Sequence, residues 1–257
     1  MFRNALRNVV RSSAYGLTSH LPTEWLQWSR SRRVIKEVLE RLAINCVLDV
    51  GANQGQYGLL LRRIGYTGWI LSFEPVSGNL KALEDVAQRR GPWRVFPYAL
   101  GASESQLEIN VAEVGTLSSF LTGNEELQRK FPQNRMEKKE SVAVRRLDDV
   151  IGACLAGIVS PRIYLKMDTQ GFDLEVVKGA EVVLRDVLAL QTEVSFKGIY
   201  HQIPGFAQSI AELQARGFEV VDFLPVDSRF DELSALEMDC IMVRSPNSAI
   251  PGSTCPA

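Results

Sequence analysis

The amino-acid sequence predicts an α/β protein built on a doubly wound, mainly parallel sheet. Apolar runs of strand length alternate with segments of helical periodicity through most of the 257 residues, which is the pattern of strand–helix–strand units. A glycine-containing turn, Gly51 to Gly55, follows the first apolar run and precedes a helical segment, and Glu74 ends the next run. Together these features are typical of the nucleotide-binding half of such a sheet.

Composition excludes several classes of protein. Hydrophobic residues make up 46% of the chain, charged residues 23%, and the net charge is −1, so nothing favours a nucleic-acid partner. The four cysteines include no Cys-x-x-Cys pair, which predicts neither a zinc site nor a disulfide framework and favours a reducing cytoplasm. No apolar run approaches the ~20 residues that span a bilayer, and no secretory signal pattern is present.

The first 44 residues are expected to form a helical segment packed on the main domain. An alternative is peripheral contact with the inner membrane surface, because a basic amphipathic helix with tryptophans can bind anionic lipids. The basic and aromatic residues that suggest it are Arg3, Arg7, Arg11, Trp25 and Trp28.

Residues 45–244 are expected to form one domain, followed by a flexible tail at 245–257 rich in proline, serine and glycine. Seven runs are predicted to be strands of the main sheet: 47–50, 69–73, 93–96, 163–168, 188–194, 218–223 and 238–243. Two alternating segments, 107–111 and 142–144, are predicted to be further strands with an exposed face.

Helices are predicted between these strands from apolar spacing and end signals. The predicted ranges are 57–64, 77–90, 174–187 and 206–216. Ser77 is the expected N-cap of the second helix, and Gly217 the C-cap of the last. The polar stretch 115–133 is expected to be a loop or lid near the site.

The spacing in the glycine turn distinguishes between cofactors. A dinucleotide site requires a third glycine, but Gln56 and Tyr57 follow Gly55. Asp49 precedes Gly51, and a carboxylate pointing into the pocket would repel a pyrophosphate while suiting a cationic sulfonium. The turn therefore favours S-adenosylmethionine over a nicotinamide dinucleotide. The alternative is a turn that serves only strand–helix packing.

Four predicted strands end in a carboxylate: Asp49, Glu74, Asp168 and Glu193. Ligands of open parallel sheets bind at the carboxyl ends of the strands, and an acid after the second strand can accept hydrogen bonds from ribose hydroxyls. Some of these acids could instead cap helices or anchor loops. A magnesium ion held by Asp168 and Glu193 is conceivable because it prefers oxygen ligands, but nothing favours it, and no metal site is predicted.

Two further residues are candidates for chemistry. His201 lies in a predicted loop that could close over an acceptor, and its ordinary pKa suits a base near neutral pH; the alternative is an exposed loop histidine. Lys166 lies two residues before Asp168, on the same strand face. We expect it to keep Asp168 or Glu193 ionised rather than to react itself.

A set of motifs spans roughly Asn45 to Val243. They are Val47-Leu48-Asp49-Val50-Gly51-Ala52-Asn53-x-Gly55, Phe73-Glu74-Pro75, Ala99-Leu100-Gly101, Leu147-Asp148-Asp149, Leu165-Lys166-Met167-Asp168-x-Gln170-Gly171 and Glu193-Val194-Ser195-Phe196 with Tyr200. In this combination the chain resembles the FkbM family of S-adenosylmethionine-dependent methyltransferases. The resemblance implies a class I methyltransferase sheet with an antiparallel final strand.

The resemblance also implies roles for individual residues. The loop with Asp49, Gly51, Asn53 and Gly55 would hold the methionine part of the cofactor. Glu74 would hold the ribose, Ala99 and Leu100 would lie along the adenine, and Asp168 would face the acceptor. Positions 170 and 173 depart from the family, which often has Glu at the first and usually at the second; the neutral Gln170 makes a catalytic role there doubtful.

The function these observations favour is methyl transfer to a hydroxyl of a sugar, glycolipid or secondary metabolite, with Asp168 as the first candidate for the base. The expected partner is a small-molecule or lipid-linked sugar acceptor, with no nucleic acid. A nicotinamide-dependent oxidoreductase and a non-catalytic cofactor-binding module of the same fold are the alternatives. The acceptor and the oligomeric state follow from no motif.

Overall fold

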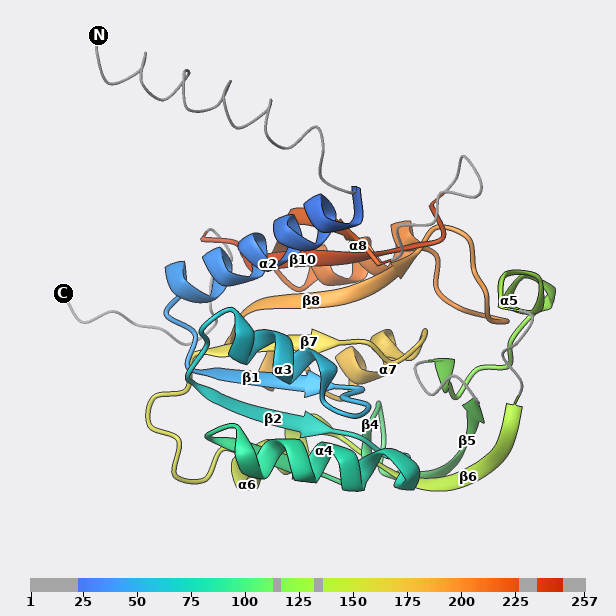
Figure 1. Cartoon of the computed structure of the whole chain (residues 1–257), viewed down its shortest axis with the longest axis horizontal. Helices are drawn as coiled ribbons and strands as arrows, with labels where there is room; N and C mark the ends of the chain where they lie inside the picture. The colour runs from blue at the N-terminus through green and yellow to red at the C-terminus, as the bar shows by residue number, and fades with distance from the viewer. Residues whose placement is uncertain (1–22, 113–116, 132–135, 227–234, 247–257) are drawn as a thin grey trace, which may run out of the picture.

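The computed structural model describes residues 23–112, 117–131, 136–226 and 235–246. Its centre is a seven-stranded sheet in the order β3-β2-β1-β7-β8-β10-β9 (Figure 1). In chain order the strands are Cys46–Val50 (β1), Trp69–Phe73 (β2), Trp93–Phe96 (β3), Ile163–Met167 (β7), Val187–Ser195 (β8), Phe218–Pro225 (β9) and Glu237–Arg244 (β10). All seven predicted strands of the main sheet are present.

The pairing of these strands confirms the predicted topology. β1 pairs in parallel with both β2 and β7, and β7 pairs in parallel with β8. β10 is antiparallel to both of its neighbours, β8 and β9. The sheet is therefore mainly parallel, and its antiparallel member is the last strand of the chain. The strand order reverses beside β1, where such sheets bind ligands.

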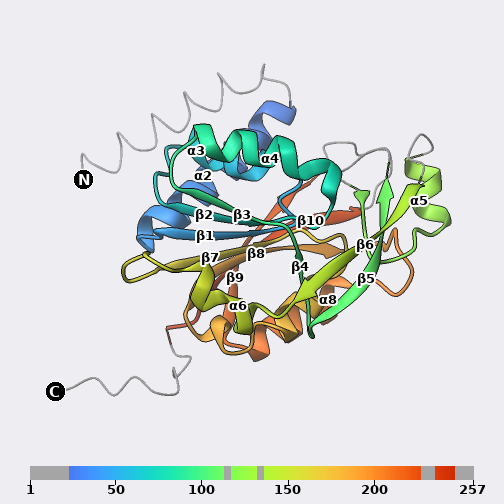
Figure 2. The same ribbon diagram turned by 90° about the horizontal axis from the view of Figure 1, so that it is seen from below.

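Helices cover both faces of this sheet, which explains the continuous apolar runs of its central strands. Figure 2 shows α2 (Thr23–Arg41), α3 (Gln56–Arg63) and α4 (Ser77–Arg89) on one face, and α6 (Leu147–Cys154) and α8 (Phe206–Ala215) on the other. Successive strand residues point to opposite faces, so the interior has two layers. Val47 packs in the layer under α2 and α3, and Leu48 in the opposite layer.

A second sheet lies beside the carboxyl ends of the main strands (Figure 1). Its order is β4-β6-β5, formed by Ala99–Leu100, Met136–Arg145 and Ser105–Ala112. β5 and β6 contain the two strands predicted with an exposed face, and they pair antiparallel. A small apolar cluster, which includes Val76 and Ile109, joins the second sheet to the start of α4. This position makes the second sheet a wall of the ligand site.

Three predicted helical features differ from the structure. The helix expected over 174–187 is only Asp173–Lys178 (α7), followed by a turn and a short 3-10 segment, Val183–Arg185. Glycine favours helices weakly, and a Cβ on Gly179 would lie 1.9 Å from the carbonyl oxygen of Gly101. The helix therefore ends at Lys178, and Gly179 allows the backbone to pack closely against Gly101.

Ser77 is not the N-cap that the sequence predicts. The capping position is Val76, which makes no side-chain cap, and Ser77 is the first helical residue. The Ser77 backbone N–H donates to Glu140 Oε1 at 2.9 Å. A carboxylate from the second sheet thus accepts a hydrogen bond from the first turn of the helix. Local sequence does not reveal this contact, because Glu140 is far from Ser77 in the chain.

The stretch predicted as a loop or lid is partly helical. Of 115–133, the structure describes 117–131, which contains α5 (Glu125–Lys130). Asn124 caps this helix by accepting from the backbone N–H groups of Glu126 and Leu127. It also donates to the carbonyl oxygen of Gly198, at 2.9 Å. The stretch is therefore attached to the loop that follows β8.

The N-terminal segment contributes α2, whose Ile35, Val38 and Leu39 are buried in the core. Arg30 at its exposed side forms an ion pair of 2.6 Å with Asp222 of β9. Arg3, Arg7, Arg11 and the tail after 246 lie outside the described residues, as do the side chains of Trp25 and Trp28. Within the part of the chain that is described, no helix combines the length and apolar character needed to cross a membrane.

Candidate active site

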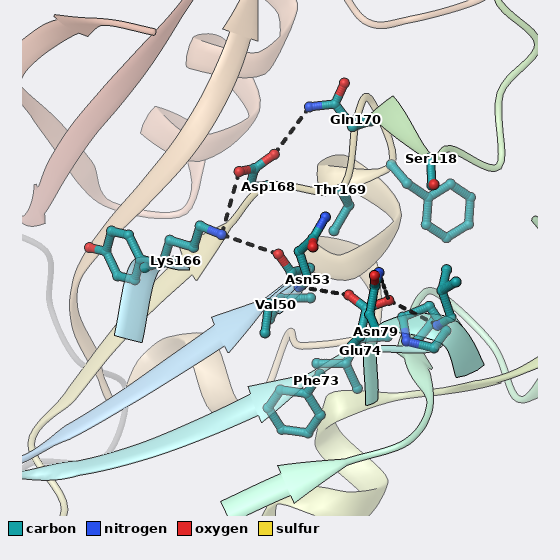
Figure 3. A pocket seen from close by; sticks show the side chains of 18 of the residues that line it. Val50, Asn53, Phe73, Glu74, Asn79, Ser118, Lys166, Asp168, Thr169 and Gln170 are labelled. Atoms are coloured by element: carbon teal, nitrogen blue, oxygen red, sulfur yellow. Dashed lines mark hydrogen bonds and ion pairs between the residues drawn. The ribbon is translucent and has the colours of Figure 1, made fainter. Parts of the chain in front are cut away.

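A cavity of about 420 Å³ opens at the carboxyl ends of β1, β2 and β7 (Figure 3). Its walls come from segments that are far apart in the sequence. One side is formed by the turn after β1, Glu74 and β4, and the other by Lys166, Asp168 and Gln170. Ser118 and Phe120, which follow the second sheet's β5, close it from above. The cavity is therefore located where the strand order predicts a ligand.

The glycine turn brings its backbone directly against the neighbouring strand end. Gly51 has φ of 76°, and a Cβ there would lie 2.0 Å from the carbonyl oxygen of Asp168. Only glycine combines this left-handed conformation with so close an approach. The next turn residue, Asn53, also has a positive φ, of 49°. Gly51 and Asn53 both line the cavity.

Gly55 plays a different part from the one predicted. It is not among the residues that line the cavity. Its φ is 90°, and a Cβ there would contact Leu83 at 3.1 Å and the Trp93 ring at 3.4 Å. Gly55 therefore gives the chain room to turn into α3 against α4 and β3, which is a packing role.

Asp49 does not point into the cavity, so the prediction for its carboxylate is wrong. The residue is 0% exposed, and its Oδ2 accepts from Ser72 Oγ at 3.2 Å. Its Oδ1 lies 3.2 Å from Lys166 Nζ. Strand alternation places Asp49 on the same sheet face as Val47, beneath the helices. Its charge is paired there, and it offers no anionic contact to a sulfonium.

Glu74 lies inside the cavity wall and is held by three N–H donors (Figure 3). Its Oε2 accepts from the backbone N–H of Asn53 at 2.8 Å. Its Oε1 accepts from the backbone N–H of Val76 at 2.9 Å and from Asn79 Nδ2 at 3.2 Å. Burial raises the pKa of Glu74, and these hydrogen bonds oppose that rise. A carboxylate fixed in this way retains lone pairs for ligand hydroxyls.

Apolar groups surround Glu74 on the cofactor side. Ala99 and Leu100 of β4 line the cavity together with Phe73 and Phe120, and their contact with an adenine stays a prediction. Phe120 packs on Phe172 with ring centroids 4.7 Å apart. A fixed acceptor beside apolar walls is the combination that a nucleoside needs, with hydroxyls at one edge and a flat base at the other.

Lys166 and Asp168 form the polar floor of the other side. Lys166 Nζ lies 3.2 Å from Asp49 Oδ1 and 3.5 Å from Asp168 Oδ2. Burial alone would lower the pKa of Lys166, but the two carboxylates outweigh burial and raise it. The lysine pairs with Asp49 and Asp168, and no ion pair with Glu193 is found among the described residues. The Asp168 side chain is 42% exposed.

Glu193 is half-buried and does not line the cavity. It is connected to Asp168 through Gln170, whose Nε2 lies 3.2 Å from Asp168 Oδ1 and 3.0 Å from Glu193 Oε2. Burial raises the pKa of Glu193 well above its usual value, and the neighbouring Asp168 adds to the rise. The absence of charge on Gln170 made a catalytic role doubtful from the sequence. In the structure its Nε2 bridges the carboxyl groups of Asp168 and Glu193.

His201 is not brought to the cavity. Its backbone N–H donates to the carbonyl oxygen of Thr122 at 2.9 Å, and its side chain is exposed. His201 is therefore an exposed histidine in the loop after β8, which was the alternative to a catalytic role. Tyr200, its neighbour, is the residue of this loop that points inward, toward Gln170.

Sequence reasoning missed Asp239 and Gln191, which line the cavity beside Lys166. Burial, followed by the charge of Asp168, raises the pKa of Asp239 to about 7. Gln191 Oε1 accepts from the hydroxyls of Tyr57 at 2.9 Å and Tyr164 at 3.1 Å. The signal that could have identified them is a polar side chain beside an apolar run: Gln191 follows Val187 to Leu190, and Asp239 precedes Cys240 to Val243.

Comparison with known proteins assigns the fold and the family. A model of the Methyltransferase FkbM domain matches residues 49–220, more than half of the chain. A comparison with curated proteins finds no match. Among solved structures, methyltransferase FkbM from Methylobacillus flagellatus KT has a TM-score of 0.51 at 16% identity. The match covers 78% of this chain and 43% of that one, so this chain spans less than half of its length.

Two further structures are similar at lower scores. Magnesium protoporphyrin IX methyltransferase (ChlM) from Synechocystis PCC 6803, solved with bound SAM, has a TM-score of 0.46 at 12% identity, covering 86% of this chain and 81% of that one. Fibrillarin from Aeropyrum pernix has a TM-score of 0.42 at 14% identity, covering 77% and 66%. The fold, the family match and the cavity lead to one conclusion: the chain belongs to the FkbM methyltransferase family, with a class I methyltransferase fold and S-adenosylmethionine as its cofactor.

Proposed function

We propose that this protein is an O-methyltransferase that acts on a hydroxyl of a sugar, glycolipid or secondary metabolite. The observation that carries the proposal is Asp168, a partly exposed carboxylate on the cavity floor, held between Lys166 and Gln170. A hydroxyl is a poor nucleophile, and a carboxylate within reach can accept its proton as the new bond forms.

The residues present fit the family's cofactor. The backbone of Gly51 to Asn53 would hold its methionine part, Glu74 its ribose hydroxyls, and Ala99 with Leu100 its base. When bound, S-adenosylmethionine supplies a methyl group on a positively charged sulfur. Since Asp49 is buried and paired with Lys166, the carboxylate that would face the cofactor's positive charge is Asp168 rather than Asp49.

Asp168 is suited to the role of base by its two neighbours. Lys166 stabilises the ionised carboxylate, and Gln170 fixes the orientation of Oδ1. The remaining lone pairs are free to accept the proton of an acceptor hydroxyl. The oxygen could then bond the methyl carbon while the bond between that carbon and the cofactor's sulfur breaks. Holding that oxygen in line and close supplies a further large part of the rate.

An acceptor carried on a lipid is supported by the basic residues of the N-terminal sequence, Arg3, Arg7 and Arg11. Such a segment can bind anionic headgroups. A lipid-linked sugar would then be methylated at the membrane surface, whereas a free sugar would not need that segment.

The test uses S-adenosylmethionine with a tritiated methyl group and two acceptor pools, a panel of methyl glycosides and a bacterial glycolipid extract. We expect Asp168→Asn to lower the rate of label transfer by about 10²- to 10⁴-fold, with cofactor affinity by calorimetry changed less than threefold. Asp149→Asn, an exposed control on α6, should transfer at the native rate. Unchanged turnover in Asp168→Asn, or label on nitrogen or carbon, would contradict the proposal.

A further inference from the structure

Gln170 is the point at which three loops meet, and its carbonyl oxygen and both polar atoms of its side chain make hydrogen bonds. Its backbone has a left-handed conformation, with φ of 53°, directly after the end of β7. Ser119 Oγ donates to its carbonyl oxygen at 2.8 Å. Its side chain reaches Asp168, Glu193 and Tyr200. A residue that only filled space would need none of these contacts.

The chemistry of its neighbours fixes the orientation of the Gln170 carboxamide. Nε2 has two hydrogens, which match the two carboxylate oxygens at 3.2 Å and 3.0 Å. Oε1 lies 3.0 Å from the hydroxyl of Tyr200, which can donate to it. The opposite orientation would place the amide oxygen against two carboxyl groups, which could bond it only when one of them is protonated.

We propose that Gln170 is a positioning residue: its neutral carboxamide aims Asp168 at the acceptor and separates Asp168 from Glu193, while Tyr200 holds the carboxamide in place. The inference deepens the proposed function, because it assigns what orients the base. It also connects the base to the segment that contains Ser118, since the single hydrogen of the Tyr200 hydroxyl is shared between Gln170 Oε1 and the carbonyl oxygen of Leu117, 3.1 Å away.

The charges around this group explain why a neutral donor is needed. The ionisable groups that act on Asp168 and Glu193 from the surrounding elements are Lys166 on β7, Asp173 on α7, Tyr200 after β8, and Glu237 and Asp239 on β10. Acids outnumber the single lysine in this set. Two N–H groups between two carboxylates stabilise both without adding charge, whereas a third carboxylate at position 170 would increase the repulsion.

The test is a titration of the ligand-free protein by carbon-13 NMR of the aspartate carboxyl groups. The Asp168 signal is identified by its loss in Asp168→Asn. In Gln170→Glu, we expect the midpoint of that signal to rise by about one pH unit or more, because an added negative charge favours the protonated acid. Gln208→Glu places the same change on the exposed face of α8 and should leave the midpoint unchanged.

A second variant covers the case in which Gln170→Glu does not fold, as judged by circular dichroism. Tyr200→Phe removes only the hydroxyl that holds Gln170 Oε1, and should raise the Asp168 midpoint in the same direction by a smaller amount. Tyr66→Phe is its control, because the Tyr66 hydroxyl donates to the carbonyl oxygen of Trp69, away from this cluster.

An Asp168 midpoint that is unchanged in both Gln170→Glu and Tyr200→Phe, or that moves equally in the controls, would overturn the inference. The titration needs neither cofactor nor acceptor. It therefore succeeds or fails separately from the methyl-transfer assay that tests the proposed function.

Discussion

The two sides of the cavity are built on different principles. On the cofactor side, the buried carboxylate Glu74 is held by two backbone N–H groups and Asn79, all from the segments next to it. On the acceptor side, Asp168 depends on the side chains of Lys166 and Gln170. Further acids, Glu193 and Asp239, lie behind it with raised pKa values.

This difference separates a half whose carboxylate is held by uncharged donors from a half whose charges depend on one another. Backbone donors are fixed by the turn that presents them and carry no proton equilibrium of their own. Side-chain carboxylates that share one cation have coupled titrations, so each one depends on the charge of the others. The structure thus combines a constant binding surface for the cofactor with an adjustable polar floor for the acceptor.

The largest expected effect comes from breaking the contact between the two halves. In Gly51→Ala, the new Cβ would clash with the Asp168 carbonyl oxygen, and the left-handed φ would add strain. We expect the free energy of unfolding to fall by more than about 3 kcal/mol, measured by urea denaturation. Gly65→Ala is the matched control: its φ is 94°, but no atom lies within 4 Å of its Cβ. If both variants lose equal stability, strain alone explains the effect and the close approach does not.

A smaller effect is expected from the cofactor half alone. Glu74→Gln keeps the size of the side chain but replaces an acceptor oxygen with a donor, which meets the N–H groups that Glu74 now satisfies. Affinity for S-adenosylmethionine should fall by about 10- to 100-fold, since hydrogen bonds to charged groups contribute about 1.5–3 kcal/mol. Isothermal calorimetry measures this loss, with the exposed Glu84→Gln on α4 as the control. Native affinity in Glu74→Gln would remove Glu74 from the cofactor site.

The smallest expected effect is a pH-dependent change in stability caused by Asp239, on the acceptor side of the cavity. The pKa of Asp239 is about 7 in the folded state, against about 3.9 in an unfolded chain. Below pH ~4 the group is protonated in both states, and stability is lost as pH rises from there through 7, because only the unfolded state ionises freely. The two pKa values correspond to about 4 kcal/mol at pH 8. Asp239→Asn should therefore be more stable than the native protein at pH 8 by part of this free energy, because the amide is neutral at every pH but also loses the attraction of Lys166.

At pH ~3.5 this advantage should be nearly absent, because the group is then mostly protonated in both states, as chemical denaturation at the two pH values will show. Asp149→Asn on exposed α6 should show no such pH-dependent difference. An Asp239→Asn variant that is equally stable or less stable at pH 8 would mean that the acceptor half is not under electrostatic strain.

Local patterns in the sequence determined much of this protein. Apolar runs of strand length, helical spacing and the turn from Gly51 to Gly55 predicted all seven strands of the main sheet and the position of the cavity. They did so because strand burial and turn conformation depend on neighbouring residues. Glu74 was equally predictable, because its place at the end of the second strand fixes which edge of the sheet it joins.

Only the tertiary structure decided which charges meet. The sequence suggested that Asp49 contacts a ligand. The structure shows that it pairs instead with Lys166, which is far from it in the sequence but lies on the neighbouring strand β7. Gln170 looked inert until Glu193 and Tyr200 were found beside it, and His201 looked reactive until its loop was seen to face solvent. The alternation of residues along a strand determines which face of the sheet a side chain lies on. The partners of that side chain come from neighbouring strands, and the sequence of one strand does not determine which strands become its neighbours.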